Sequence, residues 1–304
     1  MTDHRFITDA PVLVDPVLLV MLTGWIDASG AAAAAMEAVQ EECAAVSLVS
    51  FDDDLYIDYR ARRPTLEIRD GESTGLVWAS PELQYGRTPN GRDLLLLHGP
   101  EPDMAWHRFG TTIGDLAERF GARRMVAFGA YPFTAPHTRP VVVSATSPSK
   151  DVLDALPFRT NSVDVPAGMA AALEQVLHGR GIPSVGVWAQ VPHYVAAMAY
   201  PAASVALLDG LATVTGVTIE AEELRAEAIT HRDRLDQLVA TNDEHQTMIS
   251  QFEQLYDAAE ADETAPIPTD PTAEGQPLAG ELELRSGDEL AGEIERFLRD
   301  RGTK

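Results

Sequence analysis

The stretch that decides the fold is PVLLVMLTGWIDASGAAAAAME, residues 16–37. An apolar run is followed by a glycine and then by an alanine-rich segment, which is the pattern of a strand that turns into a helix. The turn lacks the lysine and hydroxyl of a phosphate-binding loop and the three-glycine spacing of a dinucleotide site. We therefore expect Asp27 or Ser29 to cap the helix, with its alanines packed close to a sheet. We expect this turn to border a crevice. Its main role is expected to be packing of the helix against the sheet, and binding of a ligand is expected to be secondary.

Short apolar runs alternate with helical patterns up to about residue 215, which is typical of an α/β layered sheet. The runs are apolar on both faces, as expected for strands covered by helices above and below. The expected strands are Val17–Leu22, Ala45–Phe51, Asp93–His98, Met125–Ala130, Val141–Ala145 and Ser184–Val191. The expected helices are Ser29–Cys43, His107–Phe120, Ala167–Arg180 and Ala202–Val214. This predicts an α/β fold with a three-layer αβα arrangement, a mixed, mainly parallel sheet and a C-terminal helical extension.

Residues 64–80 depart from this rhythm, because apolar and polar residues alternate there around Asp70 and Gly71. An Asp-Gly pair between alternating segments is a strong hairpin signal. We expect an antiparallel excursion from the sheet at this point. The preceding segment, residues 55–60, is expected on a loop or sheet edge outside the core, where a ligand or partner could reach it.

The last third of the chain is acidic, with 22 Asp plus Glu against 8 Lys plus Arg in residues 216–304. Apolar positions from Leu224 to Tyr256 alternate steps of three and four, which predicts a helical packing seam. The seam is one long helix, or a helical hairpin broken at Thr241–Glu244, where the sequence matches a capping box. We expect the break, because Asn242 and His245 dilute the seam.

The predicted organisation has four parts. Residues 1–215 form the α/β core, and residues 216–260 form the helical hairpin or the long heptad-like helix. Residues 261–280 are rich in acidic residues, proline and threonine and predict a disordered linker, since they can bury little apolar surface. Residues 281–304 predict a tethered amphipathic helix with Leu290, Ile294 and Phe297 on one side.

Composition narrows the possible partners and the compartment. The formal net charge of −24 argues against binding nucleic acid or an anionic membrane surface, which requires clustered Lys and Arg. The single cysteine, Cys43, suits a reducing compartment, and no signal core or membrane-length apolar run is present. We expect a cytoplasmic protein. The scattered histidines give no metal-ligand spacing, so we expect no metal site and no cofactor.

Polar residues that could hold a ligand cluster after two of the expected strands, where the crevice of a parallel sheet lies. No catalytic signature accompanies them, so the catalytic residues are unknown. The alternative interpretation is a stiff loop whose Arg139 pairs with a carboxylate elsewhere in the chain, and a histidine at a strand end that is simply hydrogen-bonded. The candidate ligand-binding residues are Gly24, Asp27, Tyr131, Thr134, His137, Thr138, Arg139, His193 and Tyr194.

Three motifs, G-W-I-D-A at Gly24–Ala28, P-H-T-R-P at Pro136–Pro140 and V-P-H-Y at Val191–Tyr194, resemble the proteasome-assembly-chaperone-two (PAC2) family. The resemblance covers about residues 17–214 and continues into the helical tail. It implies a three-layer αβα fold similar to that of nucleoside phosphorylases and peptidyl hydrolases. The eukaryotic members of this family are non-enzymatic dimeric chaperones of proteasome α-subunits, and the resemblance implies a related role here.

Two hypotheses for function follow. The first is a non-enzymatic interaction or assembly-chaperone-like protein, expected to be a homo-oligomer, with a proteasome-related subunit as a possible protein partner. The second is a small-molecule-binding protein, or a hydrolase-like or nucleoside-handling enzyme, with its pocket at the C-terminal edge of the sheet. The absence of a reaction signature in the sequence favours the first.

Overall fold

The computed structural model describes residues 3–160 and 162–261, and its centre is a mixed eight-stranded sheet. The strand order is β1-β3-β6-β7-β2-β8-β10-β9. Strands β7, β2, β8 and β10 are parallel to one another, whereas β6 pairs antiparallel with β7 and β9 pairs antiparallel with β10. The strands are β1 (His4–Phe6), β2 (Val17–Thr23), β3 (Val46–Phe51), β6 (Glu82–Arg87), β7 (Asp93–Pro100), β8 (Arg124–Phe133), β9 (Val143–Thr146) and β10 (Ser184–Pro192).

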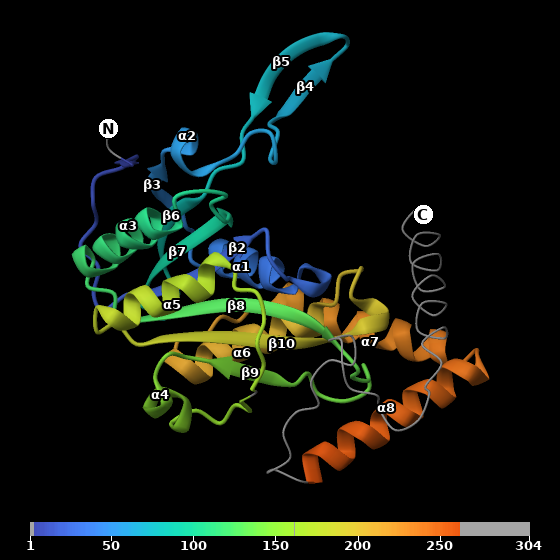
Figure 1. The fold of residues 1–304 in the computed structure, drawn as a ribbon. Helices are drawn as coiled ribbons and strands as arrows, with labels where there is room; N and C mark the ends of the chain where they lie inside the picture. The colour runs from blue at the N-terminus through green and yellow to red at the C-terminus, as the bar shows by residue number, and fades with distance from the viewer. Residues whose placement is uncertain (1–2, 161, 262–304) are drawn as a thin grey trace.

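Helices cover both faces of the sheet (Figure 1), which gives the α/β three-layer fold that the sequence predicts. On one face lie α1 (Ala31–Glu42) and α6 (Pro201–Thr215), and on the other lie α3 (Trp106–Arg119) and α5 (Met169–Gly179). Alternate residues of each central strand enter the two cores. In β2, for example, Leu19 packs on the α1 side and Leu18 on the α3 and α5 side, and both are fully buried. This alternation explains why the central strands are apolar at every position.

All six expected strands are present, with ends that differ by at most three residues. Two further strands, β1 and β6, were not predicted. Strand β6 pairs with both β3 and β7, so the sheet continues past β7 to β6, β3 and β1. It is short, and half of its residues are polar, because only alternate side chains such as Leu83 reach the core.

The predicted hairpin is present as β4 (Thr65–Arg69) and β5 (Glu72–Val77), which form their own two-stranded sheet away from the main one (Figure 1). The expectation for residues 55–60 was partly wrong. The short helix α2 (Asp53–Tyr56) turns Tyr56 and Ile57 into the core, where they are 0% and 2% exposed. The ring of Tyr56 packs edge-on against Phe51 and Phe109. These aromatic contacts keep Tyr56 buried although the residues beside it in the sequence are acidic.

The described part of the C-terminal tail contains two helices, α7 (Glu222–Val239) and α8 (Asp243–Ala261). A short helix, α4 (Lys150–Asp154), and the 3₁₀ turns η1 (Ala28–Gly30) and η2 (His193–Val195) lie elsewhere in the described residues. The seam is therefore broken where the capping sequence predicts. The capping side chain is Asn242, whose Oδ1 accepts from the amides of Glu244 and His245, rather than Thr241. The predicted linker over 261–280 and terminal helix over 281–304 lie outside the described residues, apart from Ala261. In the part of the chain that the structure describes, no helix is long and apolar enough to span a membrane.

Candidate functional site

The rim at the C-terminal ends of β8 and β10 brings together the two motifs that follow these strands. The strands run side by side in register to Phe133 and Pro192, so the loop of residues 134–140 and the turn η2 emerge at the same edge of the sheet. There the backbone amide of His137 donates to the hydroxyl of Tyr194 at 2.8 Å, and the Nδ1 atom of the same histidine lies 2.8 Å from that hydroxyl. The two polar clusters that the sequence predicts after these strands therefore lie at one rim, where the His193 and Tyr194 rings are 5.5 Å apart.

His137 is almost fully buried, and its environment favours the neutral imidazole. Burial lowers the pKa of His137 from its ordinary value, and the carboxylate of Asp236 on α7, 3.3 Å from Nε2, acts in the opposite direction. Burial also raises the pKa of Tyr194 well above its ordinary value. The pair is thus a neutral hydrogen-bonded unit near pH 7. It fixes the loop against η2, and a buried phenol of raised pKa gives up its proton reluctantly, so it is a poor acid.

Arg139 and Thr138 bind helix α8. The guanidinium of Arg139 forms a two-bond fork with Asp257, with both N–O distances at 2.8 Å, and it also contacts Glu253 at 3.0 Å. The hydroxyl of Thr138 donates to the same Glu253. The fork lowers the pKa of Asp257 and raises the pKa of Arg139. Arg139, which the sequence predicts as a candidate ligand-binding residue, is therefore already paired with carboxylates of the same chain.

Apolar contacts complete the attachment of α8 to the rim. The ring of Phe252 stacks on Tyr194, with ring centroids 6.3 Å apart and planes within 13°, and it lies 5.5 Å from the ring of His193. Phe252, Met248 and Ile249 are all buried in the core cluster on the α1 and α6 side. The tail therefore covers the rim through the apolar contacts of Phe252 and through ion pairs that include those of Arg139.

The corner at Gly24–Ala28 serves the start of α1. The carboxylate of Asp27 accepts from the backbone amides of Ala32 and Ala33 at 2.8 and 3.1 Å, so Asp27 rather than Ser29 satisfies these amides. Burial raises the pKa of Asp27, while these two bonds lower it. Asp27 also forms a parallel β-bridge with Ala130 of β8, which places this corner beside the rim.

Gly24 has a φ of +123°, and a Cβ at this position would lie 2.6 Å from the guanidinium of Arg62. The backbone conformation therefore disfavours any side chain at Gly24, whereas the contact is with the end of a flexible arginine that can move. Of the remaining candidates, Tyr131 accepts a hydrogen bond from Gln190 at 3.1 Å, and Thr134 is half-buried just after β8. Tyr131 follows Ala130 of the α1-side core and so points to the opposite face of the sheet. Tyr131 therefore lies apart from the candidates on the α1 side, and a shared ligand-binding role of the nine residues stays a prediction.

The residues that sequence reasoning missed are the tail's own partners of the rim: Asp236, Phe252, Glu253 and Asp257. Two of the acidic residues on α8 are four apart and so share one helical face. That spacing could have predicted an acidic face on the helix, but it does not show which cation pairs with that face. Among residues 3–160 and 162–261, no cluster of His, Cys, Asp and Glu could hold a metal ion.

Comparisons with known proteins agree on one family. A family model described as the PAC2 family matches residues 21–239. A Streptomyces avermitilis structure described as a PAC2 family protein is similar at 32% identity, with a TM-score of 0.68, over 74% of this chain and 96% of that chain. A Mycobacterium tuberculosis structure described as a proteasome-assembly chaperone homologue is similar at 30% identity, with a TM-score of 0.71, over 77% of this chain and 99% of that chain.

A Corynebacterium glutamicum protein of unknown function is also similar, at 30% identity and a TM-score of 0.79, over 86% of this chain and 99% of that chain. No curated protein matches the chain. The solved structures named here are covered over nearly their whole length, so the fold similarity extends across the entire relatives.

Proposed function

Because this chain belongs to the PAC2 family, we propose that it is a non-enzymatic, assembly-chaperone-like protein that acts by binding protein subunits. The Mycobacterium tuberculosis relative, described as a proteasome-assembly chaperone homologue, supports this class of function. The ligand-binding role of the nine candidate residues remains a prediction. Arg139, Thr138 and His137 already have partners within the chain, so the small-molecule alternative has less support.

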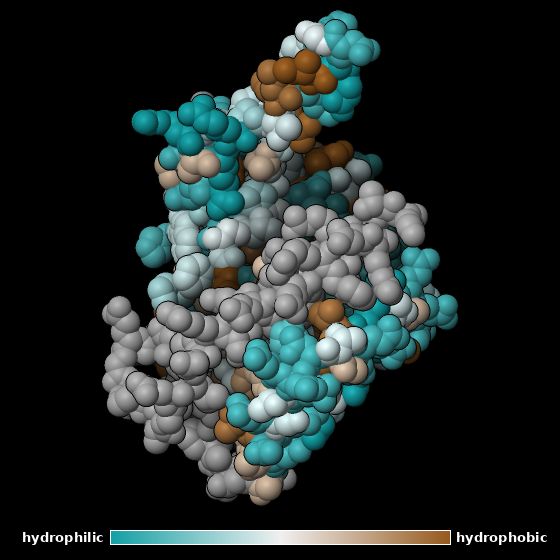
Figure 2. Space-filling view, turned by 90° about the vertical axis from the view of Figure 1, so that its right-hand side faces the viewer, coloured by the Kyte–Doolittle hydropathy of each residue, from teal (hydrophilic) through white to brown (hydrophobic). Residues whose placement is uncertain are grey.

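The observation that carries the proposal is the projecting hairpin β4–β5. Figure 2 shows hydrophobic residues gathered on it, and Leu66, Ile68, Leu76 and Val77 are each about half exposed. Leu66 and Leu76 lie directly opposite each other, so they form one continuous apolar surface. A two-stranded hairpin without further support is only marginally stable in water, so a protein surface that covers this face would stabilise it.

We infer that a second copy of this chain covers the hairpin, which makes the protein a homo-oligomer. The segment that leads into the hairpin carries the exposed cations Arg60 and Arg63. The rest of the chain is strongly acidic, and Glu222, Glu223 and Glu227 are exposed on α7. Arg60 and Arg63 are cations that such an acidic surface of a second copy attracts, in addition to the apolar contact of the hairpin. A proteasome-related subunit is the further partner that we propose, on the strength of the same relative.

The native mass tests the homo-oligomer. Light scattering after size exclusion should give a multiple of 32.9 kDa for the wild type and the mass of one chain for the double variant Leu66→Ser, Leu76→Ser. Glu67→Ser is the matched control, since it lies on the same strand but the opposite face, and it should leave the mass unchanged. A wild type of 32.9 kDa at micromolar concentration contradicts the homo-oligomer, and an unchanged mass in the double variant contradicts the hairpin as its interface.

The partner is tested separately, by co-elution with purified proteasome α-subunits from the same organism. We expect a complex whose formation is lost in the double variant and kept in Glu67→Ser. If the subunits elute alone at all concentrations tested, the proteasome-related partner is rejected while the homo-oligomer stands. A cytoplasmic location, which this partner requires, also stays a prediction.

A further inference from the structure

Exposed apolar side chains gather beside the carboxyl end of β2. Trp25 follows this strand and is 44% exposed, and its neighbour Ile26 is 39% exposed. The backbone of Gly168 lies directly against Trp25, since a Cβ on Gly168 would lie 3.0 Å from the Cβ of Trp25. The segment that leads to Gly168 carries Val163 and Val165, which are 54% and 66% exposed. We call Trp25, Ile26, Val163 and Val165 the Trp25 patch.

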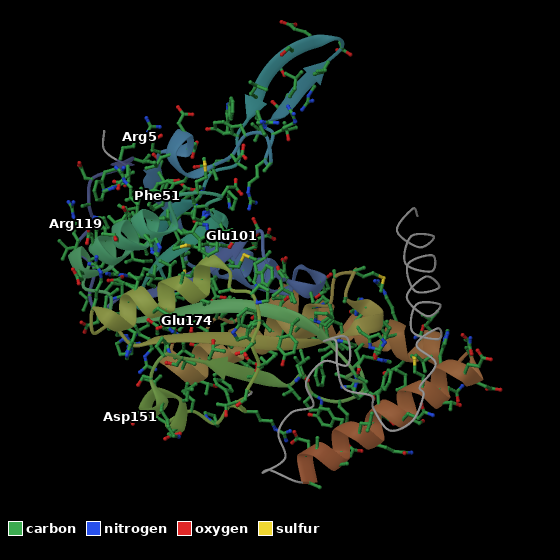
Figure 3. The ribbon with its side chains drawn as sticks, viewed as in Figure 1. Arg5, Phe51, Glu101, Arg119, Asp151 and Glu174 are labelled. Carbon is green, nitrogen blue, oxygen red and sulfur yellow. The ribbon has the colours of Figure 1, made fainter. Side chains whose placement is uncertain are left out.

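Hydrogen bonds fix the framework of the patch but not the segment that carries the two valines. The amide of Glu101, the residue after β7, donates to the carbonyl of Thr23 at 2.7 Å. The carboxylate of Glu101, which Figure 3 labels, accepts from the amide of Met169 at 2.8 Å. The ends of β2 and β7 are therefore joined to the start of α5, next to Trp25. By contrast, residues 162–167 are all exposed, and no hydrogen bond of the described structure holds them.

The described chain ends close to that segment. At the end of α8, the guanidinium of Arg159 donates to the carbonyl of Ala259 at 3.1 Å and to the carboxylate of Glu260 at 2.6 Å. Arg159 lies shortly before Val163 in the sequence, so the chain leaves α8 close to the exposed segment. Residues 262–287 follow, and a disordered chain of this length has a root-mean-square span of about 28 Å. The residues beyond can therefore reach the patch.

We propose that the C-terminal segment of residues 288–298 docks on the Trp25 patch of its own chain. The sequence predicts an amphipathic helix in this segment, and such a helix needs an apolar surface to cover its apolar side. In Figure 1 the hairpin β4–β5 projects at the end of the molecule opposite α8, so the Trp25 patch is the apolar surface closer to the end of α8. The apolar side of the segment consists of Leu290, Ile294, Phe297 and Leu298.

Charge complementarity supports this docking, and the tether favours docking within one chain. The segment ends with the cations Arg296, Arg299 and Arg301, whereas Asp164 is exposed between the two valines and the whole chain has a net charge of −24. A tethered segment has an effective concentration on the order of millimolar, well above the micromolar concentration of a second copy. The docking depends neither on the hairpin contact nor on the proposed function.

The experiment uses the full-length protein labelled with fluorotryptophan, whose four tryptophans are followed by fluorine NMR. Trp25→Phe assigns the signal of Trp25. The terminal variant Leu290→Ser, Phe297→Ser loses the apolar side of the segment, so its Trp25 signal should move and should differ more between light and heavy water as the ring becomes exposed. Asp288→Ser, Glu295→Ser is the matched control on the opposite side of the predicted helix and should leave the Trp25 signal in place.

Three results would overturn the docking within one chain. The first is a Trp25 signal that is the same in the wild type and the terminal variant. The second is a change at Trp78 alone, because Trp78 is half exposed at the end of the hairpin and would place the segment there. The third is a Trp25 signal that moves on dilution, which assigns the cover to a second copy. The hairpin variant Leu66→Ser, Leu76→Ser should keep the wild-type Trp25 signal whatever its mass, which separates this inference from the homo-oligomer.

The reciprocal change tests the patch itself. Val163→Ser, Val165→Ser weakens the apolar surface and leaves the segment unchanged, so trypsin should cleave after Arg296 severalfold faster than in the wild type. Ile229→Ser removes an exposed apolar side chain on α7 and should leave the cleavage rate unchanged. Equal rates in all three proteins contradict docking on this patch.

Discussion

Replacing Glu174 with glutamine should change how stability depends on pH. The pKa of Glu174 in the folded protein is raised from 4.5 to about 8 by burial, so between these values the folded state holds a proton that the unfolded state has lost. Stability therefore falls as pH rises from about 4.5 to about 8, and then levels off. Each pKa unit is worth about 1.4 kcal/mol, so the full loss across this window is about 5 kcal/mol. That is a large part of the stability of a typical domain.

The assay is urea unfolding at pH 5, 6, 7, 8 and 9, followed by circular dichroism. Glu174→Gln keeps the size of the side chain and cannot ionise, so its stability should vary less over this range and exceed that of the wild type at pH 8. Glu227→Gln removes the same charge from an exposed position on α7 and should follow the wild type. Parallel curves for the wild type and Glu174→Gln would refute the reasoning, because they would show that the carboxyl ionises alike in both states.

Three further substitutions test the attachment of the tail and the start of α1. Arg139→Gln removes the fork to α8 and should speed proteolysis within Asp243–Ala261, whereas Arg234→Gln, at an exposed position on α7, should not. Phe252→Ala leaves a cavity beside Tyr194 and should lower the free energy of unfolding by about 3 kcal/mol, or detach α8 alone, which hydrogen exchange distinguishes. Asp27→Ala removes the acceptor for two helix amides and should cost about 1 kcal/mol in thermal or urea unfolding; an unchanged stability contradicts its capping role.

The layered architecture could be predicted from the sequence because each central strand is buried on both faces. Val17–Leu22 and Asp93–His98 are apolar almost throughout, and only a strand covered on both sides needs that composition. Strand β6 was not predicted because it lies toward the edge of the sheet and its buried and polar residues alternate, with Leu83 buried between polar neighbours. The burial of Tyr56 was not predicted because it depends on contact with Phe109, which is distant in the sequence, and not on the acidic residues beside it.

The candidate site shows the same division between local and distant information. Parallel neighbouring strands bring His137 and Tyr194 to one edge, which the strand pattern could predict. The sequence could not show that Arg139 meets Asp257, because the two are 118 positions apart and any exposed carboxylate could have served. A pattern read within one segment predicts that segment's secondary structure, whereas the pairing of charges depends on how distant segments pack.

The attachment of α8 also has a consequence for the order of events during synthesis. The rim segment that contains His137 and Arg139 leaves the ribosome more than a hundred residues before Asp257 does. Domains fold largely as they leave the ribosome. The sheet can therefore be complete before α8 is available, so that Tyr194 is not yet covered by the ring of Phe252. A newly made chain thus passes through a stage with an uncovered aromatic rim. Ribosomes stalled before residue 243 should therefore present that surface to cellular chaperones.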